Sequence, residues 1–218
     1  MKKLILKIFL WIIVLLIIIC SIVLGLGYIK YKEAINNLNL DDAVSEIRAS
    51  DNYTNLENMC EDYKNAVVAI EDHRFYTHNG IDILSIFRST YVNLKRKSFD
   101  YGASTITQQV GRNIYFTQEK SPVRKIAEIF VAFDLEKNYS KDEILELYLN
   151  IIYFGNGYYG IHDASYGYFD KSPKDLSFYE ATYLAGLPNA PSVYSEDDEL
   201  GEERRLQIVN AMKKYNKL

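Results

Sequence analysis

Residues 71–80, with the sequence EDHRFYTHNG, carry the side chains best suited to proton transfer. They follow the apolar run 66–70, so Glu71 is expected at the end of a buried segment. Partial burial disfavours a charged carboxylate, and raises the pKa of such a group toward the pH at which a general base works. Glu71 is therefore a candidate general base. The alternative interpretation is an ordinary polar end of a helix.

Residues 102–109, with the sequence GASTITQQ, place three hydroxyls and two amides within six positions. Such neutral donors and acceptors suit sugar hydroxyls and phosphate oxygens. The segment is equally consistent with a capped turn that leads into a helix.

Arg124 and Glu128 are four positions apart and share one face of an expected helix, with Lys125 beside them. One interpretation is a surface ion pair, worth about 0–1 kcal/mol. The other is a cation near a phosphate, with a second carboxylate facing the first. Arginine suits phosphate because its planar group can donate two hydrogen bonds at once.

These segments need helices to position them, and the chain is rich in helix start signals. Ser121 precedes Pro122, which is typical of a cap followed by the first helical residue. Three Ser/Thr-x-x-Glu pairs predict capping boxes. They begin at Thr54, Ser140 and Ser177. Strand signals are sparse, so the body is predicted to be mainly α-helical, with residues 141–150 as scaffold.

The amino terminus is predicted to be a membrane anchor. Residues 8–29 form an uncharged run of 22 residues, which as a helix spans about 33 Å, the thickness of a hydrocarbon core. Three lysines and no acidic residue precede it, which favours a cytoplasmic amino terminus and an extracytoplasmic body. A cleaved signal peptide is the alternative. The expected division is a cytoplasmic tip and transmembrane anchor over 1–29, a juxtamembrane stalk over 30–53, and a catalytic domain over 54–218.

Composition excludes some classes of function. The 218 residues carry a net charge of −4, so the chain is not a general nucleic-acid binder. Cys20 lies within the apolar run, which makes a disulfide with Cys60 improbable, and the histidines do not cluster as zinc ligands.

In this order, five segments resemble the motifs of glycosyltransferase family 51. This family is the transglycosylase domain of penicillin-binding proteins and of monofunctional peptidoglycan glycosyltransferases. The five segments are 71–80, 102–109, 124–128, 141–150 and 180–191. The resemblance extends over residues 63–215.

The resemblance implies a lysozyme-like, mainly α domain with an N-terminal transmembrane helix, and lipid II as substrate. Glu71 would be the general base that activates the acceptor's 4-hydroxyl for attack on the donor's anomeric carbon, with inversion. Glu128 would be a second carboxylate near the donor pyrophosphate, possibly with Mg or Mn. The substrate-binding residues implied are Asp72, Phe75, His78, Ser104, Thr105, Gln108, Gln109, Arg112, Asn113, Arg124 and Lys125.

The resemblance also implies partners. They are lipid II, the growing lipid-linked glycan strand, the membrane, and transpeptidases or other cell-wall enzymes. Arg112 stands where the family usually has lysine, which keeps the charge but changes the geometry. Gly111 stands where a bulkier residue is usual, and is expected to loosen that turn. The chain ends soon after the fifth motif, so strand polymerisation without peptide cross-linking is expected.

Residues 81–101 mix apolar and basic side chains. The resemblance implies a membrane-dipping segment over the groove, which an apolar face with a basic flank supports. The alternative is a covered core helix.

Two other functions remain open at this stage. A lysozyme-like enzyme could cleave existing glycan, although it would need no pyrophosphate site. A catalytically silent membrane protein could scaffold cell-wall enzymes, although both Glu71 and Glu128 are present.

Overall fold

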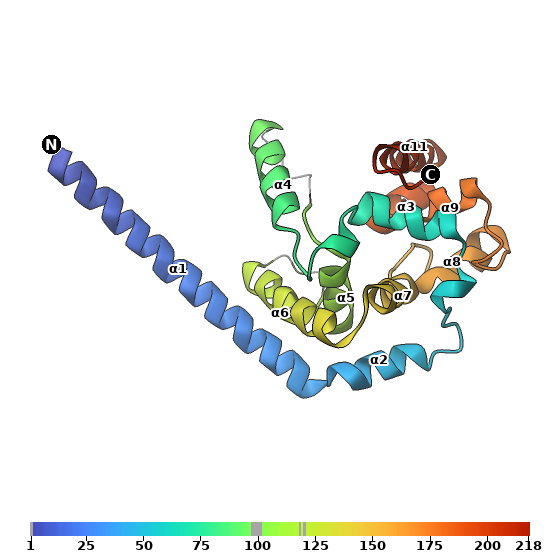
Figure 1. The fold of residues 1–218 in the computed structure, drawn as a ribbon, viewed down its shortest axis with the longest axis horizontal. Helices are drawn as coiled ribbons and strands as arrows, with labels where there is room; N and C mark the ends of the chain where they lie inside the picture. Colours follow the sequence, from blue (N-terminus) through green and yellow to red (C-terminus); the bar gives the residue numbers. More distant parts are fainter. Residues whose placement is uncertain (1, 97–101, 118, 120) are drawn as a thin grey trace.

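The computed structural model describes residues 2–96, 102–117, 119 and 121–218, and its architecture is helical (Figure 1). The α-helices are α1 (Lys2–Asn37), α2 (Leu40–Arg48), α3 (Glu61–Glu71), α4 (Ile83–Arg96), α5 (Ile106–Tyr115), α6 (Pro122–Asn138), α7 (Lys141–Ile151), α8 (Gly160–Phe169), α9 (Phe178–Leu184), α10 (Pro191–Glu196) and α11 (Asp198–Lys214). Three short 3-10 turns join them: η1 (Leu56–Asn58), η2 (Phe75–Thr77) and η3 (Leu187–Asn189). In the described residues, strand pairing is limited to one bridge between Tyr153 and Tyr159. The predicted mainly helical fold is confirmed.

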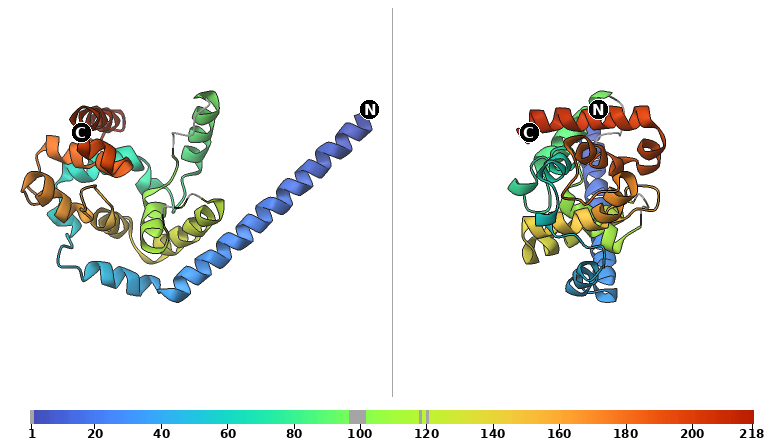
Figure 2. Two further views of the ribbon diagram at one scale, coloured as in Figure 1. Left: turned by 180° about the vertical axis from the view of Figure 1, so that it is seen from behind. Right: turned by 90° about the vertical axis from the view of Figure 1, so that its right-hand side faces the viewer.

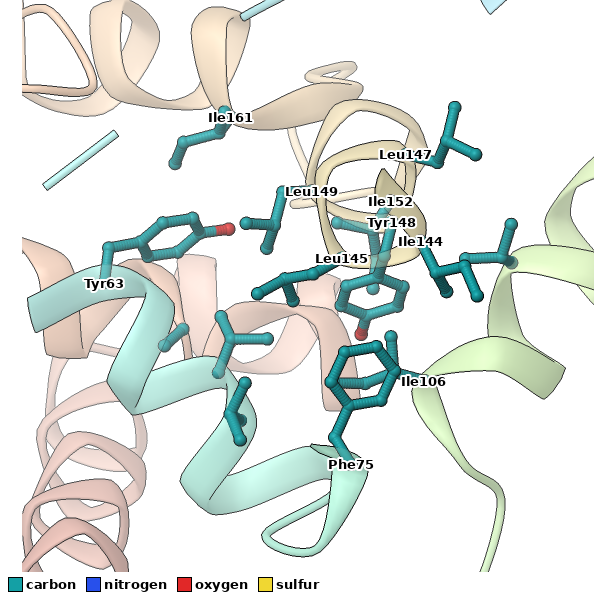
Figure 3. Close-up of a cluster of buried hydrophobic side chains, with 14 of the residues drawn as sticks. Tyr63, Phe75, Ile106, Ile144, Leu145, Leu147, Tyr148, Leu149, Ile152 and Ile161 are labelled. Atoms are coloured by element: carbon teal, nitrogen blue, oxygen red, sulfur yellow. The ribbon is translucent and has the colours of Figure 1, made fainter. Parts of the chain in front are cut away.

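Helix α7 forms the centre of the core. It packs against α5 and α8, and α2 lies along it. An α-helix that is apolar on most of its faces is buried on most of its faces. Figure 3 shows its side chains among those of Tyr63, Phe75, Ile106 and Ile161. The buried residues of α7 are Ile144, Leu145, Leu147, Tyr148 and Leu149.

Two of the three predicted capping boxes are confirmed. Ser140 with Glu143 opens α7, and Ser177 with Glu180 opens α9. The predicted cap at Ser121 is also confirmed, since its Oγ accepts the N–H of Arg124 at 3.1 Å.

The capping box predicted at Thr54 is wrong. Its backbone N–H donates to Asn150 Oδ1 at 2.8 Å, and its carbonyl accepts from Asn150 Nδ2 at 2.9 Å. The next helical turn, η1, starts only after Asn55. A side-chain amide of α7 therefore satisfies this backbone in place of a helix.

Helix α1 continues beyond the apolar run and packs against α6. A Cβ added to Gly27 would lie 2.4 Å from Ile126 Cγ2, so the two helices approach too closely for any larger residue there. The rings of Tyr31 and Phe130 lie 5.5 Å apart, and Tyr31 Oη donates to Asp134 Oδ2 at 2.5 Å. Among the described helices, α1 alone is long and apolar enough to cross a membrane, as an anchor or a signal segment would be.

The segment predicted as a stalk, residues 30–53, is also in contact with the body. Leu40, Ala43 and Val44 of α2 are buried, and α2 packs on α7. The division of the chain at residues 53 and 54 stays a prediction, but the structure joins the two parts by packing.

Helix α4 stands away from the body, and its apolar side chains face outward. Both views place its free end on the same side of the body as the amino terminus of α1 (Figures 1 and 2). Phe87 is 70% exposed and Leu94 is 75% exposed. The alternative of a covered core helix for residues 81–101 is therefore wrong for the part described here, while residues 97–101 lie outside the described residues.

Gly111 lies in the middle of α5 and is buried against α6. A Cβ at this position would lie 2.8 Å from Val131 Cγ1. Glycine thus permits close packing of two helices, and the expectation of a loosened turn is wrong.

We predict that Gly111→Leu lowers the free energy of unfolding by about 1–3 kcal/mol, because the added side chain overpacks the α5–α6 contact. Thermal unfolding of the detergent-solubilised protein, followed by circular dichroism, measures the loss. Adding Val131→Ala should restore part of it. The matched control is Gly25→Leu, where an added Cβ meets nothing within 4 Å. Equal midpoints for Gly111→Leu and the parent would contradict the prediction.

Candidate active site

Glu71 lies where two hollows of the surface meet. We call them the α4 hollow, of about 520 Å³, and the α5 hollow, of about 710 Å³. Ile70, Glu71, Gly102 and Ser104 line both. The half-buried carboxylate of Glu71 can therefore reach groups bound on either side of it.

The α4 hollow is bounded by α4 on one side and α11 on another. Its charged and polar lining includes Asp82, Ser85 and Arg88 from the α4 side and Gln207, Asn210 and Lys214 from α11. The α5 hollow is bounded by α5, the loop after α7, and the other end of α11. Its lining includes Gln109, Arg112, Asn113, Tyr153, Asn189 and Arg204.

Glu71 is the last residue of α3, and burial of that helix determines its position. Ala66, Val67, Val68 and Ala69 are buried in the turn before it. Asp72 then ends the helix, with its N–H donating to Val68 O at 3.1 Å. The apolar run thus brings the carboxylate to the edge of the core.

The side chain of Asp72 joins the end of α3 to the start of α5. Its Oδ2 accepts the backbone N–H of Ile106 at 3.2 Å and lies 2.9 Å from His78 Nε2. Asp72 is only 6% exposed. Its carboxylate lines the α4 hollow, but its hydrogen bonds are made within the protein.

Gln109 holds the carboxylate of Glu71. Its Nε2 donates to Glu71 Oε2 at 2.8 Å. Its Oε1 accepts from Arg112 Nη2 at 3.3 Å and from Tyr148 Oη at 3.4 Å. Two donors on the amide oxygen orient the amide, so that its N–H faces the carboxylate. Burial raises the pKa of the Tyr148 phenol well above its usual range, so its O–H remains a donor.

The second carboxylate, Glu128, is buried between two cations. Its Oε2 accepts from Lys125 Nζ at 2.9 Å, and its Oε1 lies 3.2 Å from Arg124 Nε, out of line for a hydrogen bond. Glu128 is 1% exposed and Arg124 is 9% exposed, so the interpretation as a surface ion pair is wrong. Burial lowers the pKa of Lys125, and the charge of Glu128 opposes that shift.

Lys125 connects this cluster to the hollows. Its Nζ also donates to Ser104 Oγ at 2.7 Å. Ser104 lines both hollows, whereas Glu128 lines neither. The expected arrangement of two carboxylates facing each other across a groove is therefore not what these contacts describe. Glu128 instead lies behind Ser104 and positions Lys125.

Several predicted binding residues have internal positions. Phe75 is fully buried, with Lys141 Nζ 4.4 Å from its ring centre. Thr105 and Gln108 form a capping box at the start of α5, and Thr105 Oγ1 also donates to Gly80 O at 2.7 Å. The six predicted residues that line neither hollow are Phe75, His78, Gln108, Arg124, Lys125 and Glu128. Those that line at least one are Glu71, Asp72, Ser104, Thr105, Gln109, Arg112 and Asn113.

The sequence did not single out the contributions of α11 or the orienting role of Tyr148. His73 stacks on Tyr215 with ring centres 4.0 Å apart, and its Nε2 lies 3.3 Å from Arg88 Nη2. Burial, and then the charges of Arg88 and Arg74, lower the pKa of His73. No local pattern marks α11, because its role depends on folding back beside α3.

The residues do not fit a divalent cation bound by Glu128, because Lys125 and Arg124 already occupy both sides of that carboxylate. Donor atoms of Asp72, His78 and Asp82 lie within 4.8 Å of one another. However, Asp82 pairs with Arg74 and accepts from Ser85, and Asp72 contacts His78. These donors serve the protein's own contacts.

Comparison with known proteins places this site in a family. The family described as Transglycosylase matches residues 39–213. Penicillin-binding protein 1F of Bacillus subtilis is 41% identical over 176 residues, which are 80% of this chain and 25% of that protein. Penicillin-binding protein 1A of Neisseria gonorrhoeae is 44% identical over 162 residues, 73% of this chain and 20% of that protein. This chain thus spans a quarter or less of the length of these two relatives.

A shorter relative is covered more fully. A protein of Cupriavidus necator, named provisionally as a transglycosylase, is 41% identical over 173 residues, which are 78% of this chain and 74% of that protein. The family match covers most of the chain and includes both hollows, the Glu71–Gln109 contact and the buried cluster around Glu128. The chain therefore belongs to the transglycosylase family.

Proposed function

We propose that this peptidoglycan transglycosylase polymerises lipid II into β-1,4-linked glycan strands and releases polyprenyl pyrophosphate. The observation that carries the proposal is the position of Glu71 at the junction of two hollows. A transfer between two sugars needs a base between two binding sites. A hydrolase needs only one sugar site and a water.

Each hollow has a role in this proposal. The donor strand lies in the α5 hollow, where Arg112 is available to its pyrophosphate. The acceptor lipid II lies in the α4 hollow, with its sugar 4-hydroxyl at Glu71. Cations aimed at a leaving group lower the barrier, because its negative charge grows in the transition state.

The reaction is a single displacement. Glu71 takes the proton of the acceptor's 4-hydroxyl, and the oxygen attacks the anomeric carbon of the donor's N-acetylmuramic acid. The bond to the pyrophosphate oxygen breaks and that oxygen keeps the electron pair, so the anomeric centre inverts. Gln109 holds the carboxylate in place, and Ser104 is available to sugar or phosphate oxygens through its position on both hollows.

The membrane arrangement is part of the proposal. Helix α1 serves as an uncleaved anchor with a cytoplasmic amino terminus, and the body lies outside the membrane. The exposed apolar side chains of α4 contact the lipid surface, since burying such surface there is favourable. Lipid II then enters the α4 hollow sideways from the bilayer.

Other partners follow from the same function. The growing lipid-linked strand is the second substrate, and transpeptidases or other cell-wall enzymes act on the product. A divalent cation, Mg or Mn, would accompany the pyrophosphate itself, since Glu128 is already paired with cations.

We predict that Glu71→Gln lowers polymerisation of labelled lipid II by about 10²–10⁴-fold, because the amide cannot accept the proton. Gel separation of glycan made by the detergent-solubilised protein gives the rate. Glu61→Gln at the exposed opposite end of α3 is the matched control and should retain the parent rate. Equal rates for Glu71→Gln and the parent would show that Glu71 is not the base. A parent that makes no glycan would instead favour a scaffolding role.

We predict that Tyr148→Phe lowers kcat about three- to tenfold, since it removes one of the two donors that orient the Gln109 amide. KM should change less than twofold, because Tyr148 lines neither hollow. Steady-state rates over a series of lipid II concentrations separate the two constants. Tyr63→Phe is the control, since that buried hydroxyl has no hydrogen-bond partner among the described residues. The orienting role is refuted if both variants keep the parent kcat.

We predict that Phe87→Ser with Leu94→Ser lowers turnover of lipid II in vesicles at least fivefold, because about 1–3 kcal/mol of favourable burial is lost for each side chain. Turnover of a short-chain soluble analogue should stay within twofold. Tyr166→Ser, a change of an exposed aromatic residue on α8, is the control. Unchanged turnover in vesicles would exclude lipid contact by α4.

A further inference from the structure

The α5 hollow holds a second arginine that lies outside the motif segments. Among the described residues that line it, the charged side chains are Glu71, Arg112 and Arg204. Arg112 follows the second motif on α5, whereas Arg204 lies on α11 near the end of the chain. The fold therefore brings two guanidinium groups from distant parts of the sequence to one hollow.

Arg204 is held in place by neutral neighbours. Its Nη1 donates to Gln207 Oε1 at 3.1 Å, and its guanidinium lies 5.9 Å from the ring centre of Tyr194. Its aliphatic stem passes close to Gly186, where an added Cβ would lie 2.9 Å from Arg204 Cγ. A glycine and a helix neighbour thus fix the side chain without using a carboxylate.

The next residue on α11 shows the contrast. Arg205 pairs with Glu202 through two hydrogen bonds, of 2.8 and 2.6 Å, and lies over the ring of Tyr179. Its charge is compensated within the protein, and it does not line the α5 hollow. The two adjacent arginines therefore differ in their partners.

Both arginines of the hollow retain an unused buried donor. Arg112 Nε and Arg204 Nε are buried and have no hydrogen-bond partner among the described residues. Leaving a buried donor unpaired is costly, and more so on a charged group. Glu71 does not relieve this, since its Oε2 accepts from Gln109 and no contact joins it to either guanidinium among the described hydrogen bonds and ion pairs.

We propose that Arg112 and Arg204 together bind an oxyanion of the substrate in the α5 hollow, with Arg204 as a binding residue contributed by α11. Guanidinium groups suit this because each can donate two parallel hydrogen bonds to a phosphate or carboxylate. The inference rests on the proposed function for the identity of the substrate. The oxyanion belongs either to the lipid pyrophosphate or to a carboxylate of the stem peptide, and both share this chemistry.

The test measures binding separately from catalysis. Glu71→Gln protein in detergent is titrated with polyprenyl pyrophosphate alone and with complete lipid II, and Kd is read by isothermal calorimetry. Arg204→Met keeps the aliphatic stem but removes the charge, so Kd should rise about tenfold or more. Arg204→Lys should give an intermediate rise, and Arg205→Met should give none. Thermal unfolding of each variant checks that the fold is retained.

The two ligands identify the source of the oxyanion. A rise in Kd for polyprenyl pyrophosphate supports the proposal and assigns the pyrophosphate. A rise for lipid II alone supports it and assigns a carboxylate of the peptide. If neither Kd changes in folded Arg204→Met protein, the proposal is overturned.

Failure of the proposed function would look different. In that case protein with Glu71 intact makes no glycan, whatever the Kd values are. A parent that polymerises while Arg204→Met binds both ligands like the Glu71→Gln reference would overturn only the role of Arg204.

Discussion

The hydrogen bonds of the Asp72 carboxylate control the geometry of the whole site. Asp72 ends α3 directly after Glu71 and accepts the first backbone N–H of α5, so two helices meet at one buried side chain. A carboxylate withdrawn from water is stable only with such donors around it. Because Gln109 lies one turn further along α5, the same contact sets how Glu71 meets its amide partner. Movement of either helix would separate base and amide.

Behind this contact lies a second layer of charge that faces the protein rather than solvent. Glu128, Arg124 and Lys125 neutralise one another in the interior, and Lys125 extends that layer to Ser104 on the surface of both hollows. A buried pair of this kind contributes little net stability, since the cost of desolvation offsets the attraction. Its value lies in presenting a cation and a hydroxyl in a fixed orientation at the site.

Local patterns predicted the helices and much of the site. The serine–glutamate pairs of α7 and α9 were predictable because the cap and its partner are three residues apart. Thr54 failed the same rule because Asn150, far along the chain, satisfies its backbone first. The sequence could not assign depth: Glu128 and Phe75 carry motif positions but are buried. Nor could it find Arg204, whose role exists only after α11 folds beside the hollow.

The close contact of Gly27 with Ile126 makes the anchor and the body one rigid piece. Helix α1 has 36 residues and is therefore about 54 Å long, which makes it a lever fixed to α6 at one end. A transmembrane helix tilts to match the thickness of its bilayer. With no hinge at Gly27, any such tilt turns the body through the same angle and raises or lowers the mouth of the site over the lipid. Bilayer thickness is thereby coupled to the height of the catalytic groove.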